Sequence, residues 1–148
     1  MVSHVLVAVD GSSHADRALD FAADLAMRYD AQLTILNVVS YASTVPLALG
    51  AYAELEGLYA ESRSVLQTAG EKIVESAAER ARRLGVAAVE TAVELGSPAQ
   101  TICETAHARH ADVVVMGRRG LGDFSGLLLG SVSHRVAHSA DCTVITVK

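Results

Sequence analysis

Short apolar runs alternate along the chain with longer segments in which apolar residues recur every three to four positions. Runs of four to eight residues, rich in valine and bounded by turn residues, are typical of strands buried on both faces of a sheet. Four such runs predict strands over His4–Val9, Gln32–Val39, Asp112–Met116 and Thr143–Val147.

One further strand is predicted over Val86–Glu94, and its pattern differs from the others. Val89, Thr91 and Val93 alternate there with more polar or smaller residues. This period of two indicates a strand that is wet on one side. We therefore expect the strand at an edge of the sheet.

The helical segments are predicted by apolar spacing and by their end signals. Ser12 and Ser13 offer a hydroxyl cap before the first helix, Ser97-Pro98 is a favourable helix start, and Gly85 suits the position after a helix end. The predicted helices run over 15–29, from about residue 62 to 84, from 97 to about 109, and from 131 to about 139.

The segment Tyr41–Glu61 is long for a strand-to-helix connection and is rich in Ala, Leu and Tyr rather than in charge. Long connections in compact domains are often functional. Two interpretations remain open: a flap that a ligand orders, or an extra helical turn that packs on the sheet.

Alternation of strands and helices predicts a parallel sheet with right-handed crossovers, here a five-stranded, doubly wound α/β fold in a single domain over 1–148. The common strand orders are 2-1-3-4-5 and 3-2-1-4-5. We favour 3-2-1-4-5, because the third strand has an edge pattern while the fourth is as apolar as the first.

Composition and charge argue against several classes of partner. The chain has 148 residues, 51% of them hydrophobic, and a net charge of -5, which argues against nucleic acid as a partner. No apolar stretch approaches a membrane span and the start lacks a signal-peptide pattern, so we expect no membrane association and a cytoplasmic location. Cys103 and Cys142 are too few and too widely spaced for a disulfide or metal framework.

The most unusual stretch follows the fourth strand and is rich in glycine, from Gly117 to Ser131. In a 3-2-1-4-5 sheet the ligand crevice lies between strands one and four, which end at Asp10 and at Met116-Gly117. Glycines let backbone approach a ligand, and a helix beginning at Ser131 would favour a phosphate. Loop turns and a merely capped helix are the competing explanation, and Asp10 could be only a helix cap.

The spacing Gly-x2-Gly-x9-Gly-Ser, met by Gly117, Gly120, Gly130 and Ser131, resembles the ATP-binding signature of the universal stress protein family. Four segments in the same order extend the resemblance over essentially the whole chain: VLVAVDGS (5–12), ILNVV (35–39), VVVMGRRG (113–120) and LLGSVSHRVAHSADCTVITV (128–147). The sequence departs from the family pattern at Cys142-Thr143, where a proline often precedes the last strand.

The resemblance implies an adenine-nucleotide α-hydrolase-like fold of order 3-2-1-4-5 and a homodimer. The apolar C-terminal strand, Val144–Val147, is an edge at which we expect the second subunit to pair. It implies ATP, or AMP or ADP, with Mg²⁺ as the bound cofactor. On the nucleoside side, Asp10 would lie by the ribose or adenine, Val9 and Val38 would line the adenine slot, and Met116 and Gly117 would pass beside the nucleotide.

On the phosphate side, the resemblance implies that Gly120, Gly130, Ser131 and Val132 cradle the phosphates, with Ser133 a weaker candidate. No catalytic or metal-binding residue is expected. A fast ATPase needs a metal and a positioned water, which the residues do not suggest, although a slow ATPase is possible.

The sequence therefore predicts an ATP-binding stress or regulatory protein. The alternatives are a dimeric interaction module without nucleotide, a slow ATPase, an ATP-pyrophosphate-cleaving ligase or a phosphoacceptor domain. The last two lack their usual signatures: Asp10-Gly11-Ser12-Ser13 is too short for the ligase loop, and no pair of acids follows the first strand.

Overall fold

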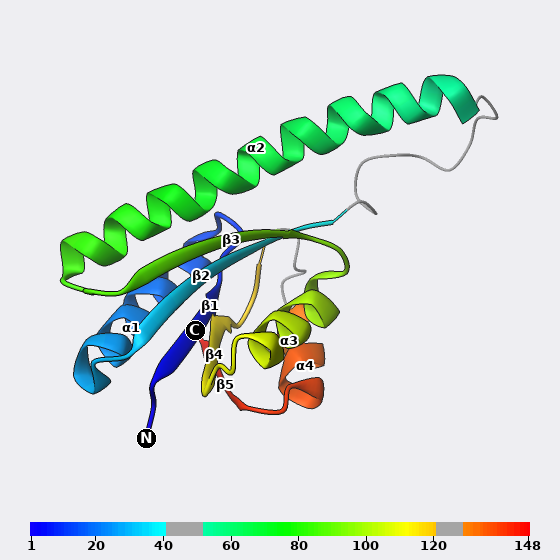
Figure 1. The fold of residues 1–148 in the computed structure, drawn as a ribbon. Coiled ribbons are helices and arrows are strands. Elements are labelled where there is room, and N and C mark those ends of the chain that lie inside the picture. The colour runs from blue at the N-terminus through cyan, green and yellow to red at the C-terminus, as the bar shows by residue number, and fades with distance from the viewer. Residues whose placement is uncertain (41–51, 121–128) are drawn as a thin grey trace.

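The computed structural model describes residues 1–40, 52–120 and 129–148, and for residues 52–62 it describes the backbone alone. Within these ranges lie nine elements (Figure 1): β1 His4–Ala8, α1 Ser13–Tyr29, β2 Gln32–Val39, α2 Tyr52–Leu84, β3 Val89–Leu95, α3 Pro98–Ala108, β4 Val113–Gly117, α4 Ser131–Ser139 and β5 Thr143–Val147.

The five strands form one parallel sheet in the order β3-β2-β1-β4-β5. This confirms the doubly wound α/β fold and the order 3-2-1-4-5. It also confirms the edge position of the third strand, in which most side chains are exposed or half-buried.

Two predicted boundaries are wrong. Helix α2 begins at Tyr52 rather than near Ser62, because residues 52–61 are mostly good helix formers that extend the same helix. Of the segment 41–61, residues 41–51 lie outside the described residues, so the flap remains a prediction. Strand β3 begins at Val89 rather than Val86, because the amide of Val86 instead donates to Ala81 O (3.1 Å) and closes the end of α2.

The sheet is covered on both faces, and each face has its own core. Helices α1 and α2 pack on one face, over Val5, Val7 and other alternate strand residues. Helices α3 and α4 pack on the other, over Leu6 and Leu36. Because successive side chains of a strand point to opposite faces, the central strands had to be apolar throughout.

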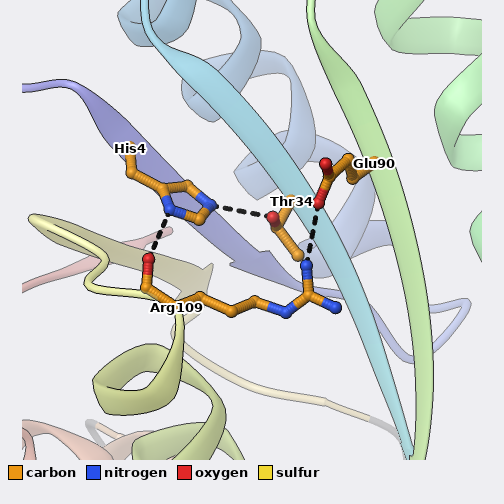
Figure 2. Close-up of polar contacts among 4 residues, drawn as sticks. All are labelled: His4, Thr34, Glu90 and Arg109. Atoms are coloured by element: carbon orange, nitrogen blue, oxygen red, sulfur yellow. Dashed lines mark hydrogen bonds and ion pairs between the residues drawn. The ribbon is translucent and has the colours of Figure 1, made fainter.

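Buried polar groups connect the amino ends of the strands (Figure 2). His4 on β1 is 9% exposed; its Nδ1 lies 2.8 Å from Arg109 O and its Nε2 2.8 Å from the hydroxyl of Thr34 on β2. A carbonyl only accepts, so Nδ1 carries a proton, and in the tautomer protonated only there Nε2 accepts from the hydroxyl of Thr34. The Arg109 side chain also donates to Glu90 on β3 (2.9 Å), so this network joins three strands to the end of α3.

We expect Thr34→Val to lower the free energy of unfolding by about 1–3 kcal/mol, because it leaves Nε2 of His4 buried without a partner. Urea denaturation measures the effect. Thr34→Ser keeps the hydroxyl and should lose less, and a valine variant as stable as the parent would contradict this account.

A second polar contact anchors the start of the chain. Oδ2 of Asp112 accepts hydrogen bonds from the Ser3 amide (2.7 Å), the Ser3 hydroxyl (2.9 Å) and the His4 amide (3.0 Å). The bond from the Ser3 amide contributes most to lowering the pKa of Asp112 below its usual value. A carboxylate with a lowered folded-state pKa stabilises the fold above its unfolded pKa and loses that effect as pH falls through the folded one.

We therefore expect Asp112→Asn to be less stable than the parent at neutral pH, with a difference that shrinks as the pH falls below about 4. Thermal denaturation of both proteins across this range measures it. A difference that stays constant with pH would exclude the carboxylate charge as its cause.

Candidate functional site

A cavity of about 280 Å³ opens at the carboxyl ends of β1, β2 and β4, next to the N-terminus of α4. All ten site residues expected from the sequence line it: Val9, Asp10, Val38, Met116, Gly117, Gly120, Gly130, Ser131, Val132 and Ser133. Residues far apart in the chain therefore meet at the point where the strand order reverses.

The cavity also has walls that the sequence reasoning missed. These residues are Ala8, Ala15, Leu36, Pro98, Ile102 and Arg119. Leu36 precedes Val38 by two positions on β2, so strand alternation would have placed the two on one face. Pro98 and Ile102 are one helical turn apart on α3, but nothing in the sequence says that α3 reaches the mouth of this crevice.

Asp10 is not the cap of α1. Ser12 has that role, since its hydroxyl accepts from the Ala15 amide (3.2 Å). Oδ1 of Asp10 accepts from the Ser12 amide (2.9 Å), which shapes the turn after β1. Oδ2 points at Gly120, where an added Cβ would lie 2.5 Å from it. The carboxylate thus lies against the loop that follows β4.

Glycine is required where β4 passes α1. A Cβ on Gly117 would lie 2.8 Å from the Cβ of His14 and 2.9 Å from Arg119 O, which is closer than such contacts occur. A side chain at Gly117 would therefore push the loop away from α1. The glycines that suggested ligand approach also serve close packing of the loop on its own protein.

The peptide groups of Arg118 hold the loop in place. Its N–H donates to Val147 O on β5 (2.7 Å), and its carbonyl accepts from the Gly130 amide (2.8 Å) and the Ser133 hydroxyl (2.9 Å). The Ser133 hydroxyl also lies 3.0 Å from Gly130 O. The Gly130 amide and the Ser133 hydroxyl are therefore engaged within the loop, and their part in the site is to position it.

The first amides of α4 also lie at this wall of the cavity. Gly130 is the N-cap, so the amides of Ser131, Val132 and Ser133 belong to the first turn, whose N–H groups have no intrahelical acceptor. The positive end of the helix dipole adds to their field. Arg119 lines the same cavity and brings a positive charge, whereas Arg118 does not line it.

A buried amide fixes the end of β1 beside the cavity. Nδ2 of Asn37, which is 7% exposed, donates to Val9 O (2.8 Å). Helix α2 approaches the side chain of Asn37 closely at Gly70. A Cβ added to Gly70 would lie 2.7 Å from Asn37 Oδ1 and 3.0 Å from the Val93 side chain. Gly70 thus lets α2 pack over the amide that positions Val9 and the adjoining Asp10.

The described residues include neither a metal cluster nor a membrane span. Across residues 1–40, 52–120 and 129–148, no three His, Cys, Asp or Glu side chains converge as a metal site. His134 and His138 both lie exposed on α4, as a solvated helix face would. Among the described helices none is long and apolar enough to cross a membrane.

Comparison with known proteins assigns the family. The sequence profile of the Universal stress protein family matches residues 1–148. The chain belongs to the universal stress protein family. It is 37% identical to the universal stress protein YxiE of Bacillus subtilis (strain 168), with all of both chains covered.

Two solved structures resemble this universal stress protein closely in fold. UspA from Lactobacillus plantarum has a TM-score of 0.87 and 24% identity, covering 99% of this chain and 98% of its own. A universal stress protein solved in complex with cAMP has a TM-score of 0.73 and 29% identity, covering 99% and 97%. The first supports the fold alone, and the second is similar enough in sequence to bear on ligand class.

We expect Gly70→Ala to destabilise the protein, although alanine favours a helix over glycine by about 1 kcal/mol. The added methyl group must displace Asn37 or part the helix from the sheet. Ser76→Ala, at an exposed position of α2, is the matched control and should be neutral or slightly stabilising. If Gly70→Ala matches this control in urea denaturation, the close approach of α2 does not matter for stability.

Proposed function

We propose that this universal stress protein binds an adenine nucleotide in the cavity at the carboxyl ends of β1, β2 and β4, and acts as a nucleotide-dependent regulatory protein rather than a metabolic enzyme. The observation that carries the proposal is that all ten residues implied by the ATP-binding signature line one cavity. Val9, Asp10 and Val38 lie at the ends of two strands, and the loop that carries the glycine motif forms the opposite wall of the same cavity.

The phosphates would bind to the first turn of α4. The amides of Ser131, Val132 and Ser133, with the helix dipole and the hydroxyl of Ser131, supply donors without any negative side chain in that turn. Arg119 adds charge complementarity at the same wall. The bonds from the Arg118 carbonyl hold this turn against the loop, so its donors are preorganised.

The nucleoside would occupy the other end of the cavity. The half-buried Val38 and Val132 provide apolar surface of the kind that a purine ring needs, backed by the buried Leu36 and Ile102. The carboxylate of Asp10 is an acceptor for a ribose hydroxyl or the exocyclic amine of adenine. A relative solved with cAMP supports an adenine nucleotide as the ligand class. ATP with Mg²⁺ is our specific proposal within that class.

The cavity offers little for ATP hydrolysis. Asp10 is the carboxylate among the described lining residues, and its Oδ1 is already bonded to the turn after β1. These described residues include no His, Lys or second acid as a general base and no metal cluster, which suits slow hydrolysis at most. We propose a binding protein that is at most a slow ATPase.

The second candidate is a dimeric interaction module that binds no nucleotide. Strand β5 favours it, because this edge strand is apolar and mostly half-buried, with a free side for pairing to a second copy. Dimerisation through β5 is compatible with both candidates, and we propose it for both. Only nucleotide binding distinguishes them.

We expect the purified protein to bind Mg²⁺–ATP, and we expect Gly130→Glu to lose at least tenfold in affinity, because a carboxylate would project where the phosphates lie. Gly120→Ala should weaken binding too, since its methyl group meets Oδ2 of Asp10. Isothermal titration calorimetry measures these affinities, and chromatography after denaturation identifies any nucleotide that co-purifies.

The matched control is His138→Glu, which adds the same charge to α4 at an exposed position away from the cavity. It should bind as the parent does, and circular dichroism confirms that each variant is folded. If the parent carries no nucleotide and binds none at millimolar ATP, the proposal is wrong. The dimeric module is then the better description.

A further inference from the structure

Two thiols outside the candidate site lie on the same patch of core. Cys103 is on α3, and Cys142 directly precedes β5. Both are free and half-buried, and both pack against the apolar cluster between the sheet and helices α3 and α4, which includes Val114 and Val136. The fold thus gathers on one small surface the two cysteines that stand far apart in the sequence.

The contacts of α3 show that Cys103 faces the segment that holds Cys142. His107 lies one helical turn after Cys103, and side chains at this spacing occupy the same side of a helix. Nδ1 of His107 reaches Oδ2 of Asp141, the neighbour of Cys142, at 3.6 Å. The side of α3 that carries Cys103 therefore faces the segment that holds Cys142.

We propose that Cys103 and Cys142 are an oxidisable pair that hydrogen peroxide converts to an intramolecular disulfide joining α3 to the start of β5. One thiolate attacks peroxide and becomes a sulfenic acid, which releases hydroxide that takes up a proton to give water. The second thiol then attacks the sulfenic sulfur, the S–S bond forms and water leaves. Peroxide is reduced to two waters and both thiols are oxidised.

The surroundings make this reaction slow at neutral pH. Burial raises the pKa of Cys103, and the neighbouring Cys142, Asp141 and Glu104 raise it further. Burial also raises the pKa of Cys142, with Asp141 and Asp112 contributing, while the Val114 amide opposes them. Because the thiolate is the nucleophile, the oxidation rate increases as pH rises above neutral.

The disulfide would also fix one wall of the candidate cavity. Ile102, which adjoins Cys103, lines it, and a bond to Cys142 would restrain α3 relative to the sheet. An effect on nucleotide affinity rests on the proposed function, whereas formation of the bond does not. The two ideas can therefore fail separately.

The test treats reduced full-length protein with hydrogen peroxide at pH 7 and pH 9, blocks remaining thiols and analyses tryptic peptides without reduction. Trypsin separates the cysteines into peptides 84–109 and 136–148. We expect these two peptides joined, at a mass two hydrogens lower than their sum, in protein that remains the size it was before oxidation. The joined species should form several-fold faster at pH 9.

Cys103→Ser and Cys142→Ser are the matched controls, and each should keep a single thiol and form no internal bond. Both proteins must first melt cooperatively, which shows that they are folded. Oxidation that yields only sulfinic acids or covalent dimers, or no change at either pH, would overturn the proposal. Reduction with dithiothreitol should restore two free thiols in the parent.

Discussion

The cavity exists because the chain leaves β1 and β4 toward opposite faces of the sheet. After β1 the connection enters α1 on one face, and after β4 it leads to α4 on the other. Right-handed crossovers on both halves of a parallel sheet make this divergence unavoidable at one place, the point of strand reversal. The candidate site lies in the opening that this divergence leaves at the carboxyl ends of β1 and β4.

Backbone hydrogen bonds and close backbone contacts hold the loop after β4 and the first turn of α4 in place. Arg118 holds the end of β5 with its N–H and the cap of α4 with its carbonyl, so one residue fixes the first turn of α4 to the sheet. Gly117 and Gly120 let the loop lie against α1 and against Asp10. On the opposite end of the sheet, the His4 network joins the strands with buried side chains instead.

The strands, most of the helices and the strand order can be predicted from the sequence. Apolar runs indicate which segments are buried, and turn residues indicate where they end. The strand order followed from the alternation in 89–93, and the position of the ten cavity residues from a glycine spacing that matched a known family. The contribution of Pro98 and Ile102 was not predictable, since it depends on where α3 lies over the sheet. The start of α2 at Tyr52 is not predicted, because the sequence analysis treats residues 41–61 as one long connection. The helix formers in 52–61 belong instead to α2. The partnership of His4 with Thr34 depends on strand register, which apolar periodicity does not reveal.

The use of main-chain donors has an evolutionary consequence. A peptide N–H is present whatever the side chain, so substitutions at Ser131 or Val132 leave the donors of the first turn of α4 in place. The side chains on the outer surface of this turn can then change while the geometry of the donors is retained. That geometry depends on the backbone and on its bonds to the Arg118 carbonyl rather than on the residue types of the turn.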